Sequence, residues 1–413
     1  MLKKYKYEIL LLLITIFWLL FFSFVLQLKI NFLLEGDEPG YFDAAQKLYV
    51  DFKLDDGRPL LISAINGFPL LFGLNSQYLN YWIFIVNLLC WLGTIFLVFA
   101  ILSEKFNKKA GFYFALIFMF SLGNLILIFK VLSESVFIFS FVLSLYFYHK
   151  QLFTNDYKYL IFAISTFFLS SLIKPIAFGM AFILILISIK KLKLVILNRF
   201  VILVLLSILL VFYQMNTLKK NYGNFTISYI DGFTYYNYLG ARADCLKNNT
   251  KFLQAQNPRF IYLNKFSHVD QKKIVFEDFK NQLTNNTSNL FQAYIINIIS
   301  NSTHGSPVID NCKNFNNTSY FNFFRIIFKI ISKLQNIIFT ICGVYMSFYI
   351  LRKHKIIDKL FFIIAILFFY VFLLSAISSN QGDRLHLVLF PLVILMFANF
   401  SNKIITKKSF LSL

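Results

Sequence analysis

The chain has 413 residues, of which 58% are hydrophobic and only 14% are charged, and its mean hydropathy is +0.66. Ordinary soluble domains carry more charge and less apolar surface, so this composition excludes a soluble domain and indicates an all-α polytopic membrane protein. The formal net charge of +21 does not indicate nucleic acid as a partner, because the Lys and Arg residues lie in short clusters between apolar segments.

A helix that crosses the hydrocarbon core needs about 20 apolar residues. The first such segment follows Lys3, Lys4 and Lys6, as in a secretory signal. Its apolar part is longer than a signal core and no small-x-small cleavage site follows, so we expect it to remain as a span. In all we expect about ten transmembrane helices, of which the fifth and sixth are short: 9–29, 78–102, 110–129, 132–149, 159–173, 175–189, 194–214, 323–350, 357–378 and 384–400.

With ten spans, every cluster of basic residues falls on one side of the membrane, which the positive-inside rule identifies as the cytoplasm. Merging 159–189 into one helix would bury Lys174 at mid-membrane, so a hairpin with Lys174 and Pro175 at its outer turn is favoured. We therefore expect a cytoplasmic (inner) membrane protein with both termini in the cytoplasm. The loop 30–77, the turn at Lys174 and the segment 215–322 then lie outside.

Three parts follow from this topology: an N-terminal transmembrane module, 1–214, with the external loop 30–77; an extracytoplasmic insert, 215–322; and C-terminal transmembrane helices, 323–413. The insert is too polar to span a membrane and long enough to fold as a small domain. Cys245 and Cys312 both lie in it, so a disulfide between its two halves stands beside the alternative of two free thiols. No Cys or His pair has zinc-site spacing.

The loop 30–77 is unusually acidic. It follows the first span directly, and seven of the 19 acidic residues fall within it: Glu35, Asp37, Glu38, Asp43, Asp51, Asp55 and Asp56. Repulsion between the adjacent carboxylates of Asp37 and Glu38 is expected to raise one pKa, leaving a group that accepts a proton near neutral pH. A hydroxyl that attacks a sugar carbon needs such a base. The alternative is the start of a solvated acidic loop.

Two arginines lie at outer membrane boundaries. Arg58 belongs to the Gly-Arg-Pro motif at 57–59, and Arg384 opens the last span in Gln-Gly-Asp-Arg-Leu-His at 381–386. An arginine binds phosphate through two parallel hydrogen bonds, and it also serves as an anchor to lipid headgroups. Asp383 and His386 are candidate partners of Arg384.

Glu134 starts the fourth span on the outer side, where a carboxylate among apolar residues indicates a functional site or a pair with Lys130 one helical turn earlier. Lys174, in the hairpin turn, is placed for phosphate contact or for reaching the interface. Together with Asp37, Glu38, Arg58 and Arg384, these residues form a set at one side of the membrane. Cations hold the phosphate of a charged lipid and a carboxylate activates the attacking group, so we expect one polar site at the outer leaflet.

The order of these motifs resembles that of the GT-C glycosyltransferases, in the bacterial branch related to protein O-mannosyltransferases and the lipid A aminoarabinose transferase. The resemblance covers about the first 190 residues and the last 30. It consists of Gly-Asp-Glu at 36–38 with Tyr41 and Ala44, Gly-Arg-Pro-Leu at 57–60 with Phe-Gly at 72–73, Ser-Glu-Ser at 133–135, Lys-Pro at 174–175, and Arg384 with Pro391.

The resemblance implies a GT-C-like helical bundle whose sugar donor is a polyprenyl phosphate, with inversion at the anomeric carbon on the extracytoplasmic face. Asp37 would be the catalytic base or its close partner, and Glu38 would support it. The donor phosphate would contact Arg58, Lys174 and Arg384. Glu134 matches a supporting acidic position. The sugar, hexosyl or pentosyl, would pass to a lipid, glycan or protein acceptor.

The chain departs from the family pattern in two places. Many relatives carry a basic or polar residue before the Tyr of the acidic motif, where this chain has Asp-Glu-Pro-Gly-Tyr at 37–41. Its hydrophilic mass lies between the seventh and eighth spans rather than at the C-terminus, so the acceptor does not carry over. Some members use a divalent metal ion and others none, which leaves the cofactor open.

Two other classes compete with a glycosyltransferase. A polymerase of O-antigen or capsule also has many spans and a large external loop, but would carry paired Arg-rich loops rather than an acidic motif after the first span. A flippase for a lipid-linked glycan would show charged residues at mid-membrane and internal repeats, which are not clear in this chain.

Overall fold

The computed structural model of the protein describes residues 5–30, 36–75, 77–253, 257–353, 357–379 and 381–410, with side chains as far as Ser401. Glu35 of the acidic loop and the basic residues Lys3 and Lys4 lie outside the described residues. Within these ranges the regular secondary structure is helical throughout and includes no strand. The prediction of an all-α protein is confirmed.

Five of the described helices are long and apolar enough to cross a membrane: α1 (Lys6–Val25), α4 (Gln77–Lys105), α7 (Glu134–Thr154), α11 (Val201–Tyr222) and α18 (Ser319–Arg352). A sixth crossing is formed if α5 (Lys108–Met119) and the segment Leu122–Phe129, which holds α6 (Leu122–Ile126) and η3 (Leu127–Phe129), act as one span bent by 64°. The chain is therefore a multi-pass membrane protein.

The remaining predicted spans correspond to α8 (Tyr157–Ser171), α9 (Ala177–Ile187), α19 (Lys359–Ser375) and, after η6 (Leu387–Leu389), α20 (Phe390–Phe410). The first three are too short for their length alone to show a crossing, and the apolar part of the last one is described only as far as Ser401. The total of about ten spans therefore stays a prediction. The seventh span lies further along the chain than predicted, because the segment after 191 forms the separate helix α10 (Leu192–Ile196), which follows η4 (Ile189–Lys191).

The chain turns at Lys174 between two separate helices, as predicted, whereas the outer position of this turn stays a prediction. The backbone N–H of Lys174 donates to the carbonyl of Ser170 at 2.9 Å, which closes α8, and α9 begins three residues after Lys174. Pro175 cannot continue the hydrogen-bond pattern of α8, so the chain turns there. The carbonyl of Leu172 accepts from the N–H groups of Leu61 and Ile62, which ties the turn to the acidic loop.

The acidic loop folds into α2 (Glu38–Tyr49), α3 (Leu60–Gly67) and η2 (Phe68–Phe72). Pro39 lies in the first turn of α2, where its missing N–H costs no helical hydrogen bond. α2 buries Tyr41 and Ala44 against the bundle. Leu71 and Phe72 of η2 are exposed, as expected for a segment that lies on a bilayer.

The insert is also helical. Its core contains Tyr235, Leu239, Leu263, Val275 and Leu290. The core is built from α12 (Ile230–Thr234), the π-helical η5 (Tyr235–Gly240), α13 (Ala241–Lys247), α14 (Pro258–Leu263), α15 (His268–Asn285) and α16 (Thr287–Thr303), and α17 (Pro307–Asp310) then leads to α18.

No disulfide pins the insert, because Cys245 and Cys312 are both free thiols. Cys245 lies on α13, whereas Cys312 follows α17, where its Sγ donates to the carbonyl of Val308 at 3.3 Å. The two halves are instead joined by Arg259, which pairs with Asp244 of α13 and Asp278 of α15.

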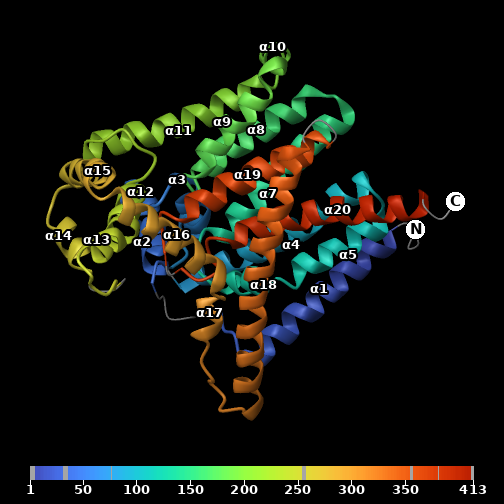
Figure 1. The fold of residues 1–413 in the computed structure, drawn as a ribbon, viewed down its shortest axis with the longest axis horizontal. Helices are drawn as coiled ribbons and strands as arrows, with labels where there is room; N and C mark the ends of the chain where they lie inside the picture. The colour runs from blue at the N-terminus through green and yellow to red at the C-terminus, as the bar shows by residue number, and fades with distance from the viewer. Residues whose placement is uncertain are drawn as a thin grey trace.

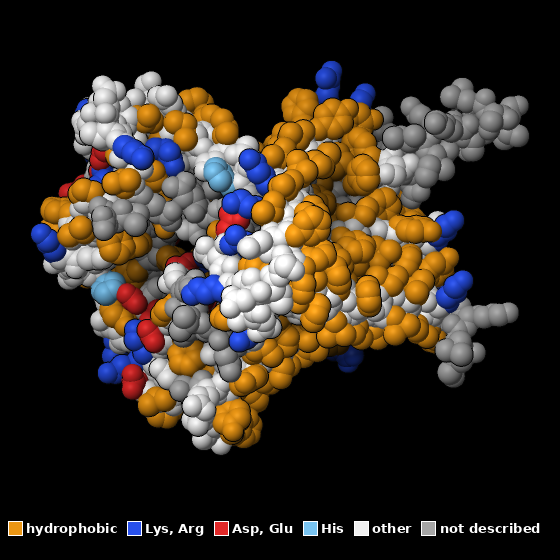
Figure 2. All heavy atoms as spheres, turned by 90° about the horizontal axis from the view of Figure 1, so that it is seen from below, with side chains coloured by type: hydrophobic (Ala, Val, Ile, Leu, Met, Phe, Trp, Pro, Cys, Tyr) orange, Lys and Arg blue, Asp and Glu red, His pale blue; other side chains and the backbone are white. Residues whose placement is uncertain are grey.

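The acidic loop and the helices α12 to α15 of the insert lie at one end of the molecule, and the start of α1 and the end of α20 lie at the other. In Figure 1, α2 and α12 to α15 are on the left, while the first turn of α1 and the last turn of α20 are close together on the right. Figure 2 shows a broad hydrophobic surface toward the termini and a mixed surface with most of the charged side chains at the opposite end. The polar segments therefore gather on one side of the apolar bundle.

Candidate active site

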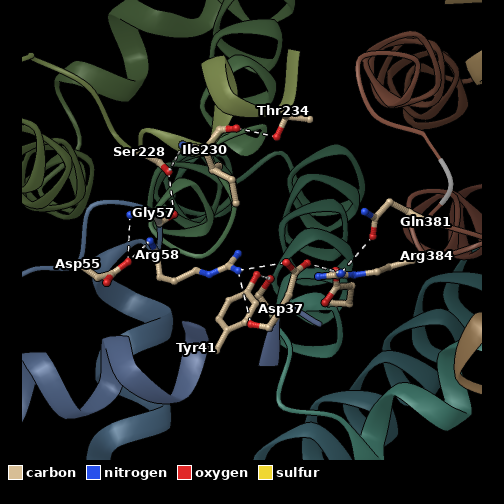
Figure 3. A network of polar contacts seen from close by, with 12 residues as sticks. Asp37, Tyr41, Asp55, Gly57, Arg58, Ser228, Ile230, Thr234, Gln381 and Arg384 are labelled. Atoms are coloured by element: carbon tan, nitrogen blue, oxygen red, sulfur yellow. Dashed lines mark hydrogen bonds and ion pairs between the residues drawn. The ribbon is translucent and has the colours of Figure 1, made fainter. Parts of the chain in front are cut away.

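Asp37 lies between two guanidinium groups. It follows Gly36, whose φ of +62° a residue with a side chain rarely adopts, and it directly precedes α2. Arg384 donates from Nη1 to Oδ2 of Asp37 at 2.6 Å, and Nη2 of Arg58 lies 3.4 Å from Oδ1. Figure 3 shows the two arginines pointing at Asp37 from opposite sides. The first and last predicted site residues are thus brought together.

Arg384 also contacts Glu134. Its Nε donates to Oε1 of Glu134 at 2.6 Å, and Nζ of Lys174 donates to the same oxygen at 2.8 Å. The Glu134 side chain is 3% exposed and sits at the first residue of α7, where the helix dipole favours a negative charge. Glu134 thereby fixes Arg384 and Lys174 side by side. The alternative pair of Glu134 with Lys130 is wrong.

The side chains of Asp383 and His386 make their hydrogen bonds to residues other than Arg384, so the prediction that they are its partners is wrong. Asp383 accepts from Oγ of Ser332 at 3.0 Å, and the His386 ring lies 3.1 Å from the hydroxyls of both Thr340 and Ser375. Because Ser332 and Thr340 belong to α18 and Ser375 to α19, these contacts tie the segment that carries Arg384 to two apolar helices.

Glu38 faces away from this network. Its Oε1 accepts from the N–H of Val131 at 2.8 Å, its Oε2 accepts from Nζ of Lys130 at 3.1 Å, and its side chain is 3% exposed. One helical turn later, the hydroxyl of Tyr41 lies 2.8 Å from Oγ of Ser133. Both contacts join α2 to the segment before α7, so Glu38 holds the helix that presents Asp37.

Arg58 is held in place by stacking. Its guanidinium carbon lies 4.1 Å from the centre of the Tyr41 ring, a cation–π geometry. The backbone N–H groups of Gly57 and Arg58 both donate to Oδ1 of Asp55, at 3.0 and 2.8 Å, which forms the turn that aims Arg58 at Asp37. The Asp55 carboxylate therefore stabilises the turn that positions Arg58.

The pKa of Asp37 is lowered, so Asp37 is not the member of the Asp37–Glu38 pair whose pKa was expected to rise. Burial raises this pKa, but the positive charges of Arg384 and then Arg58 outweigh that effect. Repulsion from Glu38 does not decide the outcome, since its carboxylate turns toward Lys130. Asp37 is therefore ionised at neutral pH. Its side chain is 42% exposed, so solvent and a substrate can reach the carboxylate.

We call Asp37, Arg58, Glu134, Lys174 and Arg384 the central cluster. Its three cations and two carboxylates leave one net positive charge. The cations supply several N–H donors in a partly buried setting, where charge-assisted hydrogen bonds are strong. This arrangement suits a group with a single negative charge.

The insert contacts both segments that carry the arginines. Oγ of Ser228 donates to the carbonyl of Gly57 at 2.8 Å, beside Arg58 (Figure 3). On the other side, Gln381 accepts from Nη1 of Arg384 at 3.3 Å and contacts the hydroxyl of Tyr238 at 3.4 Å. No sequence pattern singled out Ser228 or Tyr238, because polar and aromatic residues are common throughout the insert.

In the part of the chain that the structure describes, no group of three or more His, Cys, Asp or Glu side chains is placed to hold a metal ion. The two carboxylates of the central cluster, Asp37 and Glu134, both face guanidinium groups. These residues do not fit a metal site as they stand.

No family model and no curated protein matches the chain. Two solved structures are distantly similar to it, both of ArnT from Cupriavidus metallidurans. The structure bound to undecaprenyl phosphate has 11% identity and a TM-score of 0.42, and the match covers 96% of this chain and 78% of that one. For the apo structure the identity is also 11%, the TM-score 0.37, and the coverage 93% and 77%.

Proposed function

We propose that the protein is an integral membrane glycosyltransferase that transfers a sugar from a polyprenyl-phosphate donor to an acceptor on the extracytoplasmic face, with inversion. The observation that carries the proposal is the convergence of Arg58, Arg384 and Lys174 on the Asp37 and Glu134 carboxylates at one end of an apolar bundle. The order of the sequence motifs from Asp37 to Arg384 favours the same reaction.

The charge of the central cluster matches the donor. A sugar joined to a polyprenol through one phosphate carries a single negative charge, and the cluster has one net positive charge. The surrounding bundle is apolar, as the polyprenyl chain requires. The cations would hold the phosphate and stabilise the second negative charge that develops as it leaves.

In the proposed reaction the acceptor hydroxyl attacks the anomeric carbon from the face opposite the phosphate. The new carbon–oxygen bond forms as the bond between the anomeric carbon and the phosphate oxygen breaks, and the phosphate leaves with the electron pair. Asp37 takes the proton of the hydroxyl. Its carboxylate suits this role because it is ionised and accessible, whereas Glu134 is buried beneath Arg384.

Donor binding would also make Asp37 a better base. In the structure Arg384 and Arg58 are turned to Asp37, and their charges lower its pKa. A phosphate that draws hydrogen bonds from both arginines would compete with Asp37 for them, so the Asp37 pKa would rise toward its ordinary value. The carboxylate would then gain basicity when the donor is in place.

The test is turnover of a panel of polyprenyl-phosphate sugars by the purified protein in lipid, scored as release of polyprenyl phosphate with cell-envelope extract as acceptor. We expect wild type to release it from at least one donor. Asp37→Asn should lower the rate by about 10²–10⁴, the usual contribution of a general base. Asp43→Asn, on the exposed face of α2, is the matched control and should retain activity. No release from any donor would overturn the proposal.

A further inference from the structure

Arg242 lies next to an unusual helical segment of the insert. It is the second residue of α13 and follows η5, a six-residue π-helical stretch at Tyr235–Gly240. π-Helical turns are rare and occur often at functional sites. The residues on either side of Arg242, Ala241 and Ala243, are buried, so the backbone that carries the guanidinium is firmly placed.

Arg242 has no counter-charge among the residues that the structure describes: it forms no ion pair with them, and its buried Nε has no hydrogen-bond partner. The guanidinium lies over the Phe252 ring at 4.3 Å and makes a long contact of 3.5 Å to Oγ of Ser379. Arg259 of the same insert, by contrast, pairs with both Asp244 and Asp278. Burial lowers the pKa of the Arg242 guanidinium.

The Ser379 contact connects Arg242 to the central cluster. Ser379 is fully buried and lies five residues before Arg384 in the same segment. Two residues after Ser379, Gln381 bridges Arg384 to Tyr238 of the insert. η5 and α13 thus lie against the segment that carries Arg384, with Tyr238 and Arg242 both contacting it.

We propose that Arg242 is a second anion-binding residue beside the central cluster, and that it holds an oxyanion group, phosphate or carboxylate, of the acceptor. The identity of the ligand as acceptor rests on the proposed function. The net positive charge of the central cluster already balances the single negative charge of the donor. The positive charge of Arg242 is therefore available to a second molecule. Its place on the insert, rather than on an apolar helix, also favours an acceptor that approaches from outside the bundle.

The anion site is tested without any activity, on the full-length protein in lipid. Phenylglyoxal modifies arginines, and mass spectrometry of the peptide that contains Arg242 gives the rate. We expect sodium phosphate or sodium acetate to slow modification of Arg242 about tenfold relative to chloride at equal ionic strength. The exposed Arg199 is the control and should not be protected.

Protection by phosphate would assign a phosphate group, and protection by acetate alone a carboxylate. Equal rates in all three salts would overturn the anion site. This outcome does not depend on whether the protein is a glycosyltransferase.

The role toward the acceptor is tested with Arg242→Gln. We expect the acceptor KM, measured as the concentration of cell-envelope extract that gives half-maximal release of polyprenyl phosphate, to rise about tenfold, while the donor KM changes little. Arg242→Lys should restore part of the effect, and Lys247→Gln, an exposed cation on the same helix, should have none. An unchanged acceptor KM in Arg242→Gln would overturn the acceptor assignment. Failure of wild type to use any donor would overturn the proposed function, and the protection experiment would still decide the anion site.

Discussion

Arg384 donates a 2.6 Å hydrogen bond to Asp37, a residue 347 positions earlier in the chain. The same guanidinium reaches Glu134 through Nε, so a single side chain joins the acidic loop, the start of α7 and the segment before the last span. A shorter side chain at position 384, or one with a single nitrogen, could not donate to both carboxylates in this geometry.

Replacement of Arg384 by Lys should be nearly as harmful as replacement by Ala. A lysine ammonium is a point charge and cannot donate in a fixed fork to Asp37 and Glu134 at once. Loss of a charge-assisted phosphate contact should raise the donor KM by about tenfold or more. The measurement is turnover against donor concentration.

Arg325→Ala is a suitable control for Arg384, since Arg325 contacts only a backbone carbonyl, that of Asp310, among the hydrogen bonds of the described residues. If the donor KM of Arg384→Lys equalled that of wild type, Arg384 would not contact the donor phosphate and would only join the segments that it links.

Arg58→Gln should shift the acid side of the pH–activity profile. In wild type the Asp37 pKa lies below its ordinary value of about 3.9, so Asp37 stays ionised down to lower pH than a free aspartate. Removal of the Arg58 charge takes away one cause of the lowering, and the pKa should move up. Activity as kcat/KM, measured against pH, should then fall at a higher pH in the variant. If kcat/KM fell at the same acidic pH in wild type and in Arg58→Gln, this result would contradict the role of Asp37 as the base.

Glu134 and Lys174 should behave as a coupled pair. Glu134→Gln leaves Arg384 and Lys174 without the buried carboxylate that holds them, and Lys174→Gln removes one of its two cations. Each should lower activity and thermal stability, while the double variant should lose less than the sum. We expect a coupling of about 1–3 kcal/mol in a double-mutant cycle of unfolding free energies. Strict additivity would show that the 2.8 Å contact contributes nothing.

The proposed orientation is tested by cysteine labelling in a background without the four native cysteines. Asp270, at the start of α15, and Lys193, in α10, are both exposed and flank opposite ends of α11. A cysteine at 270 should react with a membrane-impermeant maleimide in intact cells, and one at 193 only after the membrane is opened. The reverse pattern would place the central cluster on the cytoplasmic side and exclude an extracytoplasmic reaction.

Two pairs of residues that are close in the sequence show which side-chain contacts could not be predicted from it. Lys130 and Glu134 are four residues apart, a spacing that brings side chains together on a helix. However, Lys130 follows η3 and has an extended backbone, at φ −115° and ψ 143°, so no helical turn joins it to Glu134. Asp37 and Glu38 are adjacent, yet the chain enters α2 between them and their carboxylates face different cations.

The sequence by itself determined that the chain crosses a membrane and that, apart from the clusters of Lys and Arg, few charged residues lie at the ends of its apolar segments. A charged group is so costly in this setting that Asp37, Arg58, Glu134, Lys174 and Arg384 stood out by rarity and position. Only the tertiary structure decided which charges meet, because those contacts join residues far apart in the chain and depend on how the helices pack. The same packing lowered the Asp37 pKa by placing two guanidinium groups against it.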